Sequence, residues 1–169
     1  MIVLNACAVD IPAWNELARE IEPLFGAPMA DDEGFRKILQ RKIDQGLALC
    51  VRENDGPPGT QLCGGLLFST RHHPVYQIGW LAVSEKWRLF GVGRALVMHA
   101  FGLVTPPAEV IVTTFDEGTP GGEPSRHFYE SLGFIPAELL PDEGPNGETR
   151  QRFRKAIDPV LPCNSRSLS

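Results

Sequence analysis

The chain has 169 residues, of which 22% are charged, and a formal net charge of −5. A chain of this length suits one domain that buries roughly 70% of its unfolded surface, so it needs no disulfide or metal for stability. The acidic balance argues against a nucleic-acid surface, which would carry a basic stripe. No apolar run is long enough to cross a membrane, and no basic segment typical of a signal peptide opens the chain, so we expect neither membrane contact nor export.

The cysteines indicate the compartment. They show no C-x-x-C spacing, and the first three lie in apolar runs where a small hydrophobic side chain fits; the four are Cys7, Cys50, Cys63 and Cys163. We expect free, mostly buried thiols and no metal site. This pattern favours a reduced, cytoplasmic setting.

The first part of the chain predicts a short edge strand, at residues 2–7, and then two helices. Pro12 suits a first helical turn, and apolar residues at helical spacing continue to Pro23, where we expect the first helix to end. An acidic start at Asp31 and a stop at Gly46 bound the second helix.

A hairpin and a crossover unit follow. Residues 47–52 and 62–69 are predicted strands with a Gly/Pro-rich turn between them, which favours an antiparallel hairpin. Residues 76–83 form a nearly all-apolar strand, and a helix over residues 91–101 joins it to a strand at residues 109–115. Such a crossover makes these last two strands parallel.

The end of the chain closes the sheet. We predict a helix at Ser125 and two closing strands, at residues 134–139 and 150–156. Residues 159–169 are predicted to be a loose tail, which leaves residues 1–158 as a single domain.

The segment around two closely spaced glycines predicts an anion site. Gly91 and Gly93 lie between Arg88 and Arg94, after an apolar strand and at the start of an apolar helix. The first amides of a helix lack acceptors and carry partial positive charge, so they suit phosphate oxygens, to which arginines add forked donors. We therefore expect the ligand to be a diphosphate.

Two common phosphate motifs do not fit this segment. A dinucleotide fingerprint would need a small residue where Leu96 stands, and a P-loop would need a Gly-Lys pair, which the chain lacks. A nucleoside triphosphate or dinucleotide is therefore disfavoured.

The segment resembles the pyrophosphate loop of the GCN5-related N-acetyltransferase (GNAT) superfamily. The pattern of that loop, Q/R-x-x-G-x-G/A, is met by Arg88, Gly91 and Gly93. Residues 125–134 resemble the second signature of the family, a short helix with an aromatic–Tyr129 pair followed by Gly-Phe and a strand. The resemblance implies an α/β (α+β) fold: a mixed, mostly antiparallel central sheet in which two parallel central strands splay apart, with helices on both faces.

The resemblance also implies the cofactor and its site. The cofactor would be acetyl-coenzyme A, with its pyrophosphate on the amides of residues 89–94 and its pantetheine arm along residues 81–83. Tyr129 would stand near the sulfur and protonate the departing thiolate as general acid. The predicted cofactor-binding residues are Leu81, Ala82, Val83, Arg88, Leu89, Phe90, Gly91, Val92, Gly93, Arg94 and Tyr129. Leu89 departs from the family, in which many members carry glycine directly after the arginine.

The implied activity is N-acetyl transfer by direct attack of a primary amine, on a small molecule or peptide, on the thioester. Gln77 stands where members with an assigned base often carry Glu, so the base stays open among four side chains: His72, His73, Asp116 and Glu117. The alternative is a non-catalytic acyl-coenzyme A sensor or assembly subunit of the same fold. The sequence leaves open whether two copies form a homodimer.

Overall fold

The computed structural model describes residues 1–160, apart from the side chains of Arg71 and His72. The elements, in chain order, are β1 (Leu4–Asn5), α1 (Ile11–Phe25), α2 (Glu33–Asp44), β2 (Ala48–Arg52), β3 (Leu62–His72), β4 (Val75–Val83), α3 (Val92–Phe101), β5 (Ala108–Phe115), α4 (Glu123–Ser131), β6 (Ile135–Leu140) and β7 (Arg150–Ile157). Short 3-10 turns lie before α1, after β2 and after β4. The predicted tail lies, from residue 161 on, outside the described residues.

The strands form one seven-stranded sheet in the order β1-β2-β3-β4-β5-β7-β6. Every neighbouring pair is antiparallel except β4 and β5, which are parallel. This confirms the predicted hairpin, the parallel crossover through α3 and the mixed, mostly antiparallel sheet.

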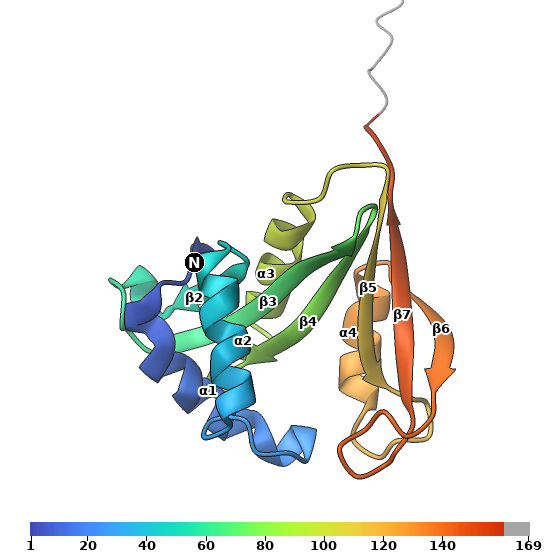
Figure 1. The fold of residues 1–169 in the computed structure, drawn as a ribbon, viewed down its shortest axis with the longest axis horizontal. Coiled ribbons are helices and arrows are strands. Elements are labelled where there is room, and N and C mark those ends of the chain that lie inside the picture. The colour runs from blue at the N-terminus through green and yellow to red at the C-terminus, as the bar shows by residue number, and fades with distance from the viewer. Residues whose placement is uncertain (161–169) are drawn as a thin grey trace, which may run out of the picture.

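Helices cover both faces of the sheet, and each face has its own apolar core. One core takes its side chains from α1 and α2, around Trp14 and Leu39. The other is built on α3 and α4, around Leu96 and Tyr129. Figure 1 shows α1 and α2 in front of β2 to β4, with α3 and α4 on the opposite side of the sheet. The prediction of helices on both faces is confirmed.

The first helix continues past the point where it was predicted to end. Pro23 lies inside α1, which ends at Phe25 and is capped by Gly26 in the left-handed conformation, at φ 74°. A proline this close to a helix end removes only one hydrogen bond of the last turns. Apolar contacts of Ile21 and Phe25 with the core hold the extra turn in place.

A bulge at Gly79 divides β4 into two halves that face opposite ways. Ile78 pairs with Phe68 and Trp80 pairs with Leu67, so Gly79 is left without a partner on β3. Before the bulge the even-numbered side chains of β4 belong to the α3 and α4 core, whereas Trp80 belongs to the α1 and α2 core. One extra residue shifts the two-residue alternation of a strand and exchanges its faces.

The parallel pairing of β4 with β5 ends at the same place. The paired residues run from Val75 with Glu109 to Ile78 with Val112, and no pair follows. Beyond this point the two strands diverge, as Figure 1 shows, although β4 continues to Val83 and β5 to Phe115. The sheet therefore contains the splay that the resemblance implied.

A buried ion pair fixes the end of the sheet nearest α1. Asp10 is fully buried, and Arg52 donates to it from Nε at 2.9 Å and from Nη2 at 2.7 Å. The amides of Gly59 and Cys7 donate to the same carboxylate. Burial alone would raise the pKa of Asp10, but these hydrogen bonds more than offset it and hold the pKa well below its ordinary value.

We predict that Asp10→Asn lowers the free energy of unfolding by about 3–5 kcal/mol at pH 7, because it leaves Arg52 buried without its counter-charge. The pKa of Asp10 is lower in the folded chain than in the unfolded one, so its contribution is complete above about pH 4 and is lost as the pH falls toward the folded pKa. Urea unfolding of both proteins from pH 7 to pH 2.5 measures this difference.

Asp31→Asn is the matched control. Asp31 lies 3.4 Å from Arg19, but both side chains are exposed, so its loss should cost less than about 1 kcal/mol at any pH. Equal losses for the two variants, or a difference that does not change with pH, would contradict the role given to Asp10.

Candidate active site

The loop between β4 and α3 presents a row of free amides. Among the described residues, no acceptor takes a hydrogen bond from the amides of residues 89–94, while the next amide, of Ala95, donates to the carbonyl of Gly91 at 2.9 Å. Arg88 and Arg94 flank this row, are exposed, and have no carboxylate partner within residues 1–160; Arg88 Nε donates only to the carbonyl of Val83. The loop can therefore hold an anion by its main chain.

The two glycines of this loop are required for different reasons. Gly91 has φ 81°, and a β-carbon there would meet nothing within 4 Å, so its backbone conformation is what requires glycine. Gly93 has ordinary helical geometry, but a β-carbon there would lie 3.1 Å from the Phe128 ring. The second glycine thus lets α4 pack against the first turn of α3.

The departure at Leu89 has a local cost. Leu89 has φ 65°, in the left-handed region, and its side chain is fully exposed. A residue with a β-carbon is disfavoured in this conformation by about 1–2 kcal/mol. This cost is a physical reason for the glycine that many members of the superfamily carry at this position. The side chain points away from the protein, so only the main chain of Leu89 serves the anion site.

Beyond the bulge, main-chain groups of β4 face the gap, which is the space that opens between β4 and β5 where their pairing ends. Ser84 donates to the carbonyl of Cys63 at 2.9 Å, and in an antiparallel pair such bonds recur at alternate residues. Ala82 is therefore bonded to β3 and buries its side chain against α1 and α2. Leu81 and Val83 turn their amides and carbonyls toward the gap. Of the three residues predicted to hold the pantetheine arm, these two present main-chain groups to the gap, where the carbonyl of Val83 already accepts a hydrogen bond from Arg88 Nε at 3.4 Å.

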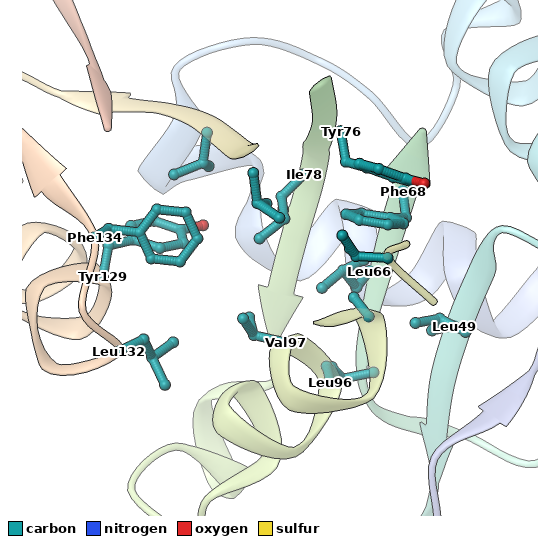
Figure 2. Close-up of a cluster of buried hydrophobic side chains, with 14 of the residues drawn as sticks. Leu49, Leu66, Phe68, Tyr76, Ile78, Leu96, Val97, Tyr129, Leu132 and Phe134 are labelled. Atoms are coloured by element: carbon teal, nitrogen blue, oxygen red, sulfur yellow. The ribbon is translucent and has the colours of Figure 1, made fainter. Parts of the chain in front are cut away.

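Tyr129 reaches the gap from α4. Its ring packs against Phe128, Phe134 and Phe153, with centroids 5.1, 5.5 and 6.4 Å away. No partner among the described residues bonds its hydroxyl, which lies on the side of the ring nearer Ile78 in Figure 2. Burial raises the pKa of Tyr129 above its ordinary value, so the phenol keeps its proton at neutral pH.

A cavity of about 370 Å³ lies in the gap, and its lining residues come from both faces of the sheet. Tyr129 and Ser125 line it from α4, Phe25 lines it from the end of α1, and Met29 lines it from the connection between α1 and α2. Strands β4 and β5 supply the walls between them. Glu143 and Pro145 of the connection between β6 and β7 line it as well, together with Arg150 at the start of β7.

The side chains considered as bases lie elsewhere. His73 stands at the turn between β3 and β4, a strand length of roughly 26 Å from the glycine loop, and packs edge-on against Tyr76. Asp116 accepts a hydrogen bond from Thr119 in the turn after β5. Neither these residues nor Gln77 and Glu117 line the cavity, and the side chain of His72 lies outside the described residues.

Sequence reasoning missed two charged residues of the cavity, Glu143 and Arg150. The sequence predicts Arg150 only as the start of a closing strand and assigns Glu143 no role. Their signal in the sequence is weak, because only the folded hairpin brings them to the mouth of the gap. Within residues 1–160, no three His, Cys, Asp or Glu side chains are grouped to hold a metal ion, and no helix is long and apolar enough to cross a membrane.

The glycine loop, the splayed strands and the tyrosine on α4 are the features by which the sequence resembles the acetyltransferases. The family model described as the acetyltransferase (GNAT) family matches residues 11–134. The chain belongs to this family, is an acyltransferase, and uses acetyl-coenzyme A. A search of curated proteins found no match.

Solved structures show the same fold at low sequence identity. Ard1 from Thermoplasma volcanium superimposes with a TM-score of 0.72 at 16% identity, over 92% of this chain and 97% of that one. The ribosomal-protein-alanine N-acetyltransferase from Brucella melitensis gives 0.70 at 17% identity, over 93% and 100%. An aminoglycoside 6′-N-acetyltransferase complexed with coenzyme A gives 0.71 at 17%, over 95% and 99%. These similarities establish the fold. The acceptor of this chain has to be inferred from the residues of its own cavity.

The contact between Gly93 and Phe128 predicts energetic coupling. Gly93→Ala should lower the free energy of unfolding by about 1–3 kcal/mol, because the new methyl group overlaps the ring. In a Phe128→Leu background the same change should cost markedly less. Chemical unfolding of the two single variants and the double variant measures the coupling.

Gly91→Ala is the control for this cycle. Its cost, about 1–2 kcal/mol, comes from backbone conformation and should be the same with Phe or Leu at position 128. Independent effects of Gly93→Ala and Phe128→Leu would show that the ring is not what requires the second glycine.

Proposed function

We propose that this protein transfers the acetyl group of acetyl-coenzyme A to a primary amine of a small molecule or peptide, with Tyr129 as general acid. The observation that carries the proposal is the continuity of the site. Leu81 and Tyr129 line one cavity, and beyond Leu81 strand β4 leads through Val83 to the free amides at residues 89–94.

The loop fits the pyrophosphate of the cofactor. Six successive amides at the start of α3 and two arginines without carboxylate partners among residues 1–160 concentrate donors and positive charge, which favours an anion. Arg88 and Arg94 would each reach phosphate oxygens from the rim. Gly91 lets the chain turn sharply enough for the amides to converge.

The gap fits the extended arm and the thioester. Leu81 and Val83 would exchange hydrogen bonds with the amides of the arm, which replaces the missing strand partner. Acetyl-coenzyme A supplies the activated acetyl group when bound. An amide of β4 that faces the gap, at Leu81 or Val83, is placed to donate to the carbonyl oxygen as negative charge develops on it.

The phenol of Tyr129 stays protonated, so it could donate a proton to the departing coenzyme A thiolate. The aromatic residues around the ring exclude water and keep the phenol neutral, which makes its hydroxyl a donor throughout the physiological range. The amine would enter from the α1 and α2 side, past Phe25 and Met29, opposite the side that carries Tyr129. Donor and acceptor would thus meet through the sheet.

Acetyl-coenzyme A should raise the melting temperature of the protein, while NAD and ATP should not. At a hundredfold excess over Kd the ligand adds about 2.7 kcal/mol of stability, or roughly 5–10 °C for a chain of this size. Differential scanning fluorimetry with the three ligands tests this prediction. Equal or larger shifts with NAD or ATP would contradict the assignment.

Tyr129→Phe should lower kcat roughly a hundredfold with little change in cofactor affinity, because it removes one hydroxyl and keeps the ring. Thiol release over a panel of amines gives the rate, and calorimetry with coenzyme A gives the affinity.

Tyr76→Phe is the control for this measurement. Tyr76 is the other tyrosine of the chain, and its buried hydroxyl accepts a hydrogen bond from the amide of Thr105, away from the cavity. If Tyr129→Phe retained the parent rate, or lost no more rate than Tyr76→Phe, Tyr129 would not be the acid.

A further inference from the structure

Arg150 is a buried cation in the wall of the candidate acceptor site. It begins β7, lines the cavity, and leaves 9% of its surface exposed. Its guanidinium lies 4.4 Å from the centroid of the Phe115 ring. Phe115 is its direct partner across β5 and β7, so the strand pairing and the ring together fix the position of the charge.

Only part of this guanidinium is used by the protein. Nη2 donates to Oε1 of Glu148 at 3.0 Å, and Nε and Nη1 have no partner among residues 1–160. These two nitrogens are not among the fully enclosed polar atoms that lack a partner, unlike Nε of Arg152. Arg150 lines the cavity, so donors that are neither bonded nor fully enclosed are available to a ligand there.

A guanidinium in this setting favours an anionic ligand. Burial removes most of the water that would otherwise solvate the charge, and one bond to Glu148 leaves most of its five donors without partners. Glu148 already pairs with the charge, and a carboxylate in the cavity would match the planar arrangement of the donors that remain.

The rest of the cavity indicates what accompanies the carboxylate. Glu143 lies on the same β6–β7 connection and lines the cavity, so it can attract a protonated amine. The walls from Phe25, Met29 and Trp80 are apolar. A ligand with an amine, a carboxylate and an apolar side chain would meet a suitable group on each side.

We propose that the acceptor is an apolar α-amino acid, or a close analogue, whose carboxylate is bound by Arg150. This assignment rests on the proposed function, because it concerns the acceptor side of the same site. Arg150 would be a specificity-determining residue that touches the acceptor, and Glu143 would face the amine end before transfer.

Leucine and leucinamide form the test pair, since they differ only in the carboxylate. Arg150→Gln should lower kcat/KM for leucine by roughly ten- to a hundredfold, mainly through KM, and change leucinamide by less than threefold. The ratio of parent to variant is compared for each acceptor separately, so the different amine pKa values of the two compounds cancel. Arg150→Lys, which keeps the charge, should restore part of the loss.

Arg152→Gln is the matched control variant. Arg152 is the next arginine of β7 on the same side of the strand, does not line the cavity, and has Glu138 at 4.0 Å. It should change neither acceptor by more than threefold. An equal loss with leucine and leucinamide in Arg150→Gln, or no loss with leucine, would overturn the assignment.

A binding measurement keeps the test independent of turnover. Calorimetry of the coenzyme A-loaded parent should show N-acetylleucine binding at least tenfold more tightly than N-acetylleucinamide, with the preference lost in Arg150→Gln. Equal affinities would overturn the role of Arg150 even if transfer occurs. Failure to bind coenzyme A would instead overturn the proposed function, and leucine titrated into the protein alone would still decide whether Arg150 binds a carboxylate.

Discussion

The end of the pairing between β4 and β5 is the constraint on which the site depends. Neighbouring parallel strands normally pair their main-chain amides and carbonyls along their whole length. Where the strands separate inside a protein, each amide or carbonyl that is left buried without a hydrogen-bond partner costs roughly 1–3 kcal/mol of stability. Here the bulge at Gly79 makes the break abrupt, because the strand changes faces within one residue. The resulting gap stays open because both of its edges continue as strands held by their outer neighbours, β3 and β7.

The same break brings the two cores of the protein into one cavity. A continuous sheet would separate the α1 and α2 side from the α3 and α4 side, and a ligand on one face could not meet a ligand on the other. Through the gap, Met29 and Tyr129 line a common space although they belong to opposite layers. Two substrates can therefore approach from opposite faces, which keeps their binding sites separate until the reacting atoms meet.

The sequence predicted the hairpin, the crossover and the glycine loop, and it missed the bulge in β4. The glycine loop and the helix after it were predictable because positive φ and free amides are properties of a short segment. The bulge was not, since residues 76–83 are almost all apolar and both faces of β4 are buried, so no polar residue reveals the change of face. His73 was a poor candidate on topology alone, because a turn that precedes a strand lies at the opposite end from the loop that follows it.

The sequence also could not predict that Arg150 lines the cavity. Arg150 belongs to a strand whose alternate positions carry several arginines, and Arg152 and Arg154 look the same in sequence. Only the position of Phe115 and the end of the sheet distinguish the one that enters the cavity from the two that pair with glutamates on the strands beside it.

The packing of α4 on α3 has a consequence for how such chains can vary. Gly93 is required because the Phe128 ring lies beside it, and the ring fits only because residue 93 has no side chain. A change at either position alone therefore disturbs the packing. Chains that preserve this helix junction should substitute positions 93 and 128 together, whereas position 91 should keep glycine whatever its surroundings, because its backbone conformation alone requires it.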